Sequence, residues 1–127
     1  GTGHSVSFVG NVHEGPHALN GRNTVVFQPG MIVTDEPGVY EGGQVGIRIE
    51  NELMCVHKAD NQYGTFLGFE PIMFVPIATS PIVPGVLTKD ELDWLNNYHR
   101  QVFEKLAPRL NDEEREWLAK KCAAIGC

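Results

Sequence analysis

The arrangement of apolar residues changes near residue 88, and this change constrains the fold more than any other feature of the chain. Before it, short runs of β-branched and aromatic residues are separated by turn signals such as Asn20-Gly21, Pro37-Gly38 and Gly42-Gly43, a pattern typical of short strands. After it, apolar residues recur at intervals of three and four, which indicates amphipathic helices. The sequence therefore predicts an α+β fold in which strands come first and helices follow.

Four runs in the first part have the composition of strands. They are residues 24–27, 31–34, 46–56 and 66–76. Prolines at positions 71 and 76 restrict the last run to an edge strand, a bulge or two pieces, because proline cannot donate to a sheet ladder.

Two capping boxes mark the helix starts, since in each a cap side chain and the residue three positions later satisfy one another's backbone N–H groups. The boxes are Thr88 with Glu91 and Asn111 with Glu114. The second helix is expected to continue through Ile125.

Length and composition indicate one ordinary globular unit. The chain has 127 residues, of which 42% are hydrophobic and 20% charged, so a packed core is expected. We expect two parts, residues 1–86 and 87–127, with an extended connection over residues 76–85. Because the chain starts at Gly1 rather than Met, we also expect it to be part of a longer protein.

Charge, the length of the apolar runs and cysteine content indicate which partners and which compartment to expect. Ten basic residues against sixteen acidic ones give a net charge of -6, which would repel a nucleic-acid backbone. No apolar run is long enough to cross a bilayer, so no membrane partner is expected. The three cysteines form no Cys-x-x-Cys pair, which favours a reducing compartment and a cytoplasmic location.

Three of the five histidines, His4, His13 and His17, lie in the glycine-rich start of the chain. A single histidine is more often a hydrogen-bonded structural residue than a ligand. His13 differs because Gly15 and Pro16 follow it closely and predict a tight turn, where an exposed imidazole can face a ligand.

Strict alternation over residues 46–52 predicts a strand with Arg48, Glu50 and Glu52 on one face. One interpretation is a solvated face on which the arginine and a carboxylate contribute under about 1 kcal/mol. The other is a metal-bound carboxylate, Glu50, that Arg48 orients and keeps ionised. The pattern leaves both interpretations open.

A second carboxylate, Glu36, ends the predicted strand 31–34 and precedes Pro37-Gly38. One interpretation is a solvated turn. The other combines Glu36 with Glu50 and a histidine in a mixed O/N ligand set, which suits Mn, Co, Fe or Zn and can bridge two ions. Spacing alone does not decide between them.

Four ordered segments are specific enough to compare with known families. They are Gly1-Thr2-Gly3-His4, Asn11-Val12-His13-Glu14-Gly15-Pro16, Gly30-Met31-Ile32-Val33-Thr34-Asp35-Glu36-Pro37-Gly38 and Gly46-Ile47-Arg48-Ile49-Glu50-Asn51. Together they closely resemble the carboxy-terminal part of the catalytic domain of Xaa-Pro aminopeptidases, also called aminopeptidase P. Residues 66–71 and 93–99 look like the tail of the cytosolic, eukaryotic-type branch. The resemblance runs from Gly1 to about Ile125.

The resemblance implies part of the pita-bread fold, with mostly antiparallel strands followed by two C-terminal helices. Methionine aminopeptidase, proline dipeptidase and creatinase share this fold. It also implies a dinuclear site in which His4, Glu36 and Glu50 are metal ligands, with Glu50 bridging the two ions.

The remaining site residues are also implied by the resemblance. Glu36 would double as the proton shuttle, and His13 corresponds to a histidine that contacts the substrate near the scissile bond. Arg48 corresponds to an arginine that orients the metal-bound carboxylates, and Tyr40 to an active-site tyrosine.

The implied enzyme is a metallo-aminopeptidase that hydrolyses the N-terminal bond of peptides with proline at the second position. It would hold two divalent ions, manganese first, with zinc and cobalt as alternatives. Two aspartate ligands of the family have no counterpart in this sequence. We therefore predict that the chain alone is inactive and requires the missing N-terminal portion of the same protein. The resemblance further implies a homodimer, in which the helical tail takes part.

Other interpretations share parts of this evidence. Ser5 and Ser7 replace two glycines of the family's first block, which leaves the shape of the loop around His4 open. A proline dipeptidase or another pita-bread hydrolase would have the same ligands, and a non-catalytic homologue could act as a binding module. A mononuclear metal oxidoreductase on a β-barrel fits the helical tail poorly.

Overall fold

The computed structural model describes residues 1–83 and 85–126. The chain divides into two compact units, Gly1–Met73 and Phe74–Cys127. Pro84, in the predicted connection, lies outside the described residues. Among those that are described, no helix combines the length and the apolar character needed to cross a membrane.

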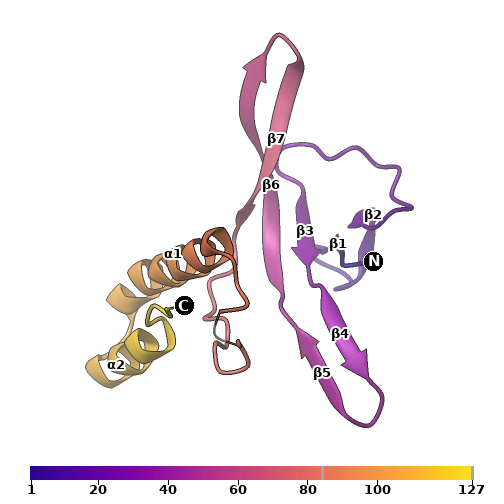
Figure 1. Ribbon diagram of the computed structural model, residues 1–127. Coiled ribbons are helices and arrows are strands. Elements are labelled where there is room, and N and C mark those ends of the chain that lie inside the picture. The colour runs from indigo at the N-terminus through magenta and orange to yellow at the C-terminus, as the bar shows by residue number, and fades with distance from the viewer. Residues whose placement is uncertain (84, 127) are drawn as a thin grey trace. The chain divides into compact units, whose positions relative to one another are not determined.

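The first unit consists of antiparallel strands in two sheets (Figure 1). The strands are β1 (Gly3–Ser5), β2 (Glu14–Leu19), β3 (Ile32–Asp35), β4 (Gly38–Glu41), β5 (Val45–Arg48), β6 (Asn51–Asn61) and β7 (Gly64–Pro71). The larger sheet has the order β2-β1-β3-β6-β7, and β4 pairs with β5 as a separate ribbon. All pairings are antiparallel. The α+β prediction is confirmed by these strands and the helices that follow them.

The predicted strands differ from the observed ones in informative ways. The run 46–56 is divided between β5 and β6, because the chain leaves the ribbon and enters the larger sheet at residues 49–50. The run 66–76 ends at Pro71 on the edge strand β7, which agrees with the limit set by its prolines. Three strands, β1, β2 and β4, were not predicted.

The prediction of a strand at residues 24–27 is wrong. This segment has no sheet partner in the structure. The Phe27 ring instead makes edge contacts with the rings of His17 and Phe69, at centroid distances of 5.4 and 5.2 Å. This ring packing and the Asn23 side chain, which hydrogen-bonds both the oxygen and the N–H of Val25, therefore hold the segment in place of a ladder.

β1 and β3 approach one another closely, and a glycine makes this possible. A Cβ atom on Gly3 would lie 1.8 Å from the backbone oxygen of Thr34, so any larger residue would force the strands apart. The β1–β2 pairing also shifts register between His4 and Ser5, so the ladder is irregular at the predicted ligand His4.

The second unit contains α1 (Lys89–Leu106), the 3-10 turn η1 (Ala107–Arg109) and α2 (Asp112–Lys121). Both predicted capping boxes are confirmed. The core of this unit is formed by Tyr98, Val102, Ala107 and Leu118.

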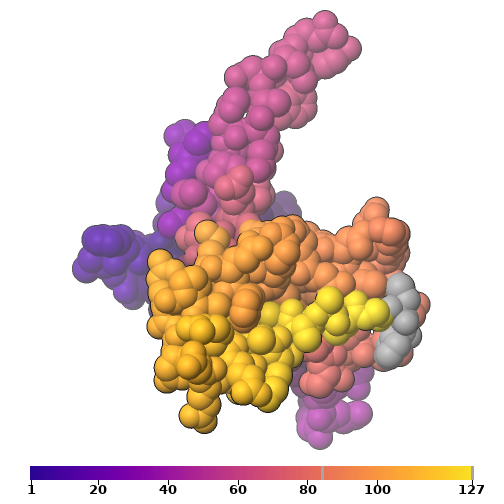
Figure 2. All heavy atoms as spheres, turned by 90° about the vertical axis from the view of Figure 1, so that its left-hand side faces the viewer, coloured from indigo at the N-terminus to yellow at the C-terminus, as the bar shows by residue number. Residues whose placement is uncertain are grey.

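The predicted continuation of the second helix through Ile125 is wrong, because α2 ends at Lys121. Asn96 of α1 instead binds the backbone of Ile125 on both sides, donating to its oxygen and accepting from its N–H at 3.0 Å each. The last described residues, yellow in Figure 2, consequently lie against the helical unit.

Adjacent residues of α1 bind the segment that follows the sheet. The Tyr98 hydroxyl donates to Val75 O at 2.9 Å, and the Ile77 N–H donates to Nε2 of His99 at 3.0 Å. His99 is fully buried, and burial lowers the pKa of its imidazole below the ordinary value.

Candidate metal centre

The predicted metal ligands lie where the chain passes between the larger sheet and the β4–β5 ribbon. Glu36 lies between β3 and β4, and Glu50 between β5 and β6. The Ile49 N–H donates to Pro37 O at 3.2 Å, which holds the outgoing and returning segments together, and the Glu36 N–H donates to Thr2 O at 2.6 Å. The ribbon thus returns the chain so that both carboxylates face the same site.

The His4 ring is oriented by a hydrogen bond from Nδ1, while Nε2 faces Glu36. Nδ1 lies 2.9 Å from the backbone oxygen of Ser5, and Nδ1 must carry the hydrogen because a carbonyl oxygen only accepts. Nε2 faces Glu36 Oε1 at 2.9 Å. Metal-binding histidines commonly donate their second N–H to a carbonyl in this way. His4 is therefore oriented with its free ring nitrogen toward the carboxylate.

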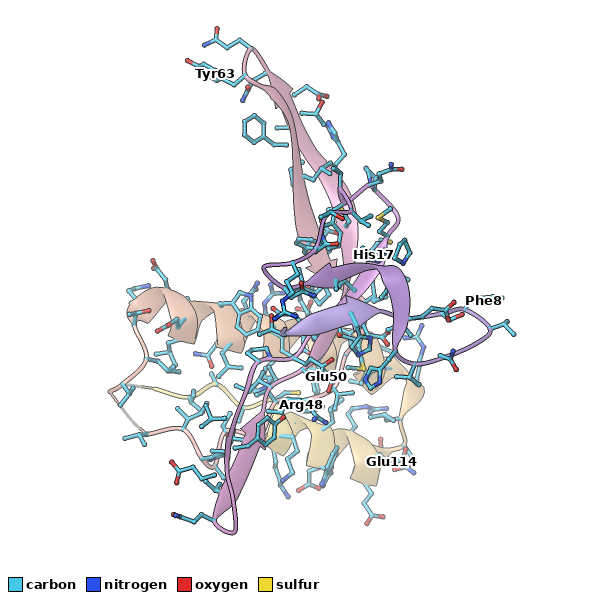
Figure 3. All side chains as sticks on the ribbon, turned by 90° about the vertical axis from the view of Figure 1, so that its right-hand side faces the viewer. Phe8, His17, Arg48, Glu50, Tyr63 and Glu114 are labelled. Atoms are coloured by element: carbon cyan, nitrogen blue, oxygen red, sulfur yellow. The ribbon has the colours of Figure 1, made fainter. Side chains whose placement is uncertain are left out.

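Arg48 connects the two carboxylates. Its Nε lies 3.1 Å from Glu50 Oε2 and 3.9 Å from Glu36 Oε2, and its Nη1 donates to the Tyr40 hydroxyl at 3.4 Å. The hydrogen bond and electrostatic interaction with Tyr40, and then the charge of Glu50, raise the pKa of the guanidinium above its ordinary value. Figure 3 shows Arg48 and Glu50 close together. The guanidinium remains a permanent cation that orients both acids.

Two glycines shape the place of Tyr40. On the ribbon, Tyr40 is the cross-strand neighbour of Gly46, and Gly38 that of Arg48. A Cβ atom added to Gly38 would lie 2.7 Å from the Tyr40 hydroxyl, and one added to Gly46 would lie 3.0 Å from the Tyr40 ring. The phenol therefore lies flat across positions without side chains, with its hydroxyl near Arg48.

His13 lies beside His4. Their ring centroids are 4.2 Å apart, with the planes at 82°. His13 is exposed, just before β2, so its polar nitrogens are accessible to a molecule approaching the site.

His4, Glu36 and Glu50 are of the residue types that bind divalent metal ions, but they do not form a complete metal site. With Nδ1 protonated, a neutral His4 turns a lone pair toward the carboxylate, so attraction between them requires a proton or a cation. Within residues 1–83 and 85–126, no three His, Cys, Asp or Glu side chains are grouped so that they could hold a metal ion. The chain therefore offers part of a mixed N/O ligand set, with Arg48 paired to both acids.

The predicted site residues form one contact network in the structure. It contains His4, Glu36, Glu50, Arg48 and Tyr40, with His13 against the ring of His4. His17, the third early histidine, is buried in the sheet and contacts the Ile32 backbone oxygen at 2.6 Å.

Sequence reasoning missed one participant, Thr34. Its hydroxyl contacts both the backbone of His4 and the carboxylate of Glu36. Its place two residues before Glu36 is visible in the sequence, but no spacing rule shows where its hydroxyl points.

Comparison with known families accounts for almost the whole chain. Residues 1–57 match the model of metallopeptidase family M24, and residues 65–125 match the model of the C-terminal region of peptidase M24. The chain therefore belongs to metallopeptidase family M24.

Curated relatives are similar to the chain over nearly its full length. The chain is 42% identical to a probable Xaa-Pro aminopeptidase P of Coprinopsis cinerea over 98% of its length and 21% of the relative's. It is 43% identical to aminopeptidase P1 of Lotus japonicus, over 99% of this chain and 20% of that protein. The chain thus spans about a fifth of the length of these relatives.

A solved structure shows the same fold. The X-prolyl aminopeptidase of Caenorhabditis elegans, described as a cytosolic enzyme with a di-nuclear active site, matches with a TM-score of 0.84 and 39% identity. The match covers 98% of this chain and 21% of that one. The predicted partial pita-bread fold is confirmed by this likeness.

Proposed function

We propose that this chain supplies His4, Glu36 and Glu50 to the dinuclear metal site of an Xaa-Pro aminopeptidase that is longer than the chain itself. One observation carries the proposal: His4, Glu36, Arg48 and Glu50, from separate elements, form a continuous set of contacts between 2.9 and 3.9 Å. The similarity to relatives with that activity supports it.

Each residue has a role in the proposed reaction. When bound, two divalent ions, manganese first and zinc or cobalt as alternatives, would supply Lewis-acid activation of a water molecule. Glu36 would take a proton from this water molecule and pass it to the leaving nitrogen. The proton would bind at Oε2, because Oε1 already faces Thr34 and His4. Arg48 would hold both carboxylates in place. His13 would contact the substrate around the bond that precedes proline, and Tyr40, whose hydroxyl accepts from Arg48, would be the active-site tyrosine.

The test is hydrolysis of an Xaa-Pro peptide by the full-length protein in the presence of manganese. Glu36→Gln should lower kcat by about 10²- to 10⁴-fold, the usual contribution of a general base. Glu41→Gln, in the exposed end of the ribbon, is the matched control and should leave kcat unchanged. Absence of Xaa-Pro hydrolysis by the full-length protein would contradict the proposal.

The 127-residue chain by itself is expected to bind metal weakly and to be inactive. Two divalent ions would face one imidazole and two carboxylates, too few ligands to fix catalytic geometry. Mixing the chain with the remainder of the protein should restore turnover. Robust hydrolysis by the chain alone would refute this expectation.

The main rival is a proline dipeptidase, which the length of the substrate distinguishes. Activity on Xaa-Pro dipeptides but not on longer peptides would favour it. Ser5, one of the two serines on which a non-catalytic homologue rests, does not disturb His4. Ser5 is buried in β1 and binds His4 through its backbone oxygen, so its side chain leaves that contact intact.

The helical unit is proposed to take part in a homodimer. Trp94 is 58% exposed and stacks on Tyr98 with ring planes at 5°, and exposed aromatic residues are favoured in interface cores. Sedimentation of the full-length protein tests this, because Trp94→Ala should shift it toward monomer. An unchanged sedimentation coefficient would assign Trp94 to packing within the unit.

The division into parts 1–86 and 87–127 and the cytoplasmic location remain proposals. Limited proteolysis should cleave near residue 86 if the predicted boundary is right. A fluorescent fusion of the full-length protein should appear in the cytoplasm, and enrichment in another compartment would contradict the location.

A further inference from the structure

The hydroxyl of Thr34 lies at the junction of two proposed metal ligands. Thr34 is in β3, only 2% exposed. The backbone N–H of His4 donates to Thr34 Oγ1 at 3.0 Å, and Oγ1 donates to Glu36 Oε1 at 3.0 Å. A buried hydroxyl requires partners, and both of these belong to ligands.

The single hydroxyl hydrogen is assigned by elimination. Because the His4 N–H can only donate, it occupies a lone pair of Oγ1. Two acceptors then compete for the hydrogen: Glu36 Oε1 at 3.0 Å and the His4 backbone oxygen at 3.5 Å. The carboxylate is nearer and charged, so it forms the stronger bond.

These contacts form a closed ring that starts and ends at His4. It runs from the His4 backbone to Thr34, from Thr34 to Glu36 Oε1, and from Oε1 back to the His4 imidazole at 2.9 Å. One carboxylate oxygen therefore lies between the hydroxyl, which donates to it, and the imidazole, whose attraction to it requires a proton or a cation. Rotation of the carboxylate would break two of the three contacts.

The backbone holds the ring in place. The absence of a side chain at Gly3 permits the close approach of β1 to β3, which brings the His4 N–H within reach of Thr34. The branched Thr34 side chain is stiff about its first torsion, so the hydroxyl position follows from the strand backbone.

We propose that Thr34 is a positioning residue that fixes His4 and Glu36 relative to one another, so that they act as one preformed half of the metal site. This inference rests on the proposed function. Loss of a residue that orients metal ligands typically costs 10–100-fold in metal affinity. Thr34→Val, which keeps the shape and removes the hydroxyl, is expected to show a loss of this size.

Manganese binding to the full-length protein, measured by titration calorimetry, tests the inference directly. Thr34→Val should weaken binding by about 10–100-fold, and Thr34→Ser, which retains the hydroxyl, should stay within about threefold of the wild type. The matched control is Thr65→Val, which also removes a hydroxyl that donates to a carboxylate, at 2.7 Å to Asp60. Thr65→Val should leave manganese affinity unchanged.

Each outcome decides a separate question. Failure of the wild-type protein to bind manganese, zinc or cobalt would refute the proposed metal site, and the inference with it. Wild-type binding with equal affinity in Thr34→Val would overturn the inference alone. Equal losses in Thr34→Val and Thr34→Ser would also overturn it, because packing rather than the hydroxyl would then be responsible. Thermal unfolding of each variant confirms that folded protein is compared.

Discussion

Acidification should destabilise the helical unit through His99. The imidazole is fully buried and its Nε2 accepts the Ile77 N–H at 3.0 Å, so adding a proton there would break this bond and bury a charge. Burial accordingly lowers the pKa of His99 from its ordinary value of 6.5. The folded state binds the proton less readily than the unfolded state.

The sign and the size follow from proton linkage. Because the folded pKa lies below the unfolded one, the stabilisation is fully present above about pH 6.5 and is lost as the pH falls toward the folded pKa. Within that window the free energy of unfolding should fall by up to about 1.4 kcal/mol per pH unit. The pKa of Glu91 is lowered by its hydrogen bonds with Thr88, so its stabilisation is lost only below its ordinary value of 4.5, whereas the loss through His99 already begins near 6.5.

Urea unfolding followed by tryptophan fluorescence isolates this effect. Both tryptophans, Trp94 and Trp117, belong to the helical unit, and His99 is its single histidine. The unfolding free energy should be level from pH 8 to about 6.5 and decline below it. His99→Gln should remove the decline, whereas His57→Gln, on the exposed hairpin of the other unit, should retain it. A level profile in the wild type, or a decline that survives in His99→Gln, would refute the reasoning.

Three substitutions test the packing that supports the site and the helices, each by thermal or urea unfolding. Gly3→Ala should lower the free energy of unfolding by about 1–3 kcal/mol, because its Cβ would lie 1.8 Å from Thr34 O. Gly21→Ala is the control and should not destabilise the protein, because a Cβ there meets nothing within 4 Å. Thr88→Ala removes the N-cap of α1 and should cost about 0.5–2 kcal/mol. Leu118→Ala opens a cavity in the helical core and should cost about 2–5 kcal/mol. Values near zero would contradict each assignment.

The helices were more predictable than the strands because their signals are local. Each capping box is complete within four residues, and both occur as expected. The end of α2 depends instead on Asn96, which binds the backbone of Ile125 from another helix. No periodicity within the second helix contains that information.

The strands were harder to predict because they depend on partners that are distant in the sequence. β1 is three residues long and too short to display alternation, and it exists because β2 and β3 flank it. The ribbon hairpin could have been inferred from the Gly42-Gly43 turn and the residues on either side. The apolar Thr24–Phe27 run has the composition of a strand, yet its phenylalanine packs on other rings.

The sequence could indicate which residues belong to the site, but not which contacts they make with one another. Motif blocks indicated His4, Glu36, Arg48 and Glu50. Spacing alone could not show that a single guanidinium contacts both acids, because this depends on the ribbon returning the chain to the sheet. The hydroxyl of Thr34 was missed for the same reason: its partners come from two strands.

Arg48 can affect metal binding in two opposite ways, and one substitution distinguishes them. Its positive charge competes with a metal ion for the carboxylates, while its planar guanidinium orients them. Arg48→Lys keeps the charge and loses the planar group, in which Nε faces both carboxylates while Nη1 donates to Tyr40. An ammonium has only one nitrogen and cannot hold these positions together. If orientation dominates, Arg48→Lys should weaken manganese binding to the full-length protein by about 10–100-fold. Arg22→Lys, at an exposed position, is the matched control. Unchanged or tighter binding in Arg48→Lys would show that the guanidinium mainly balances charge, and the role of Arg48 in orienting the carboxylates would be wrong.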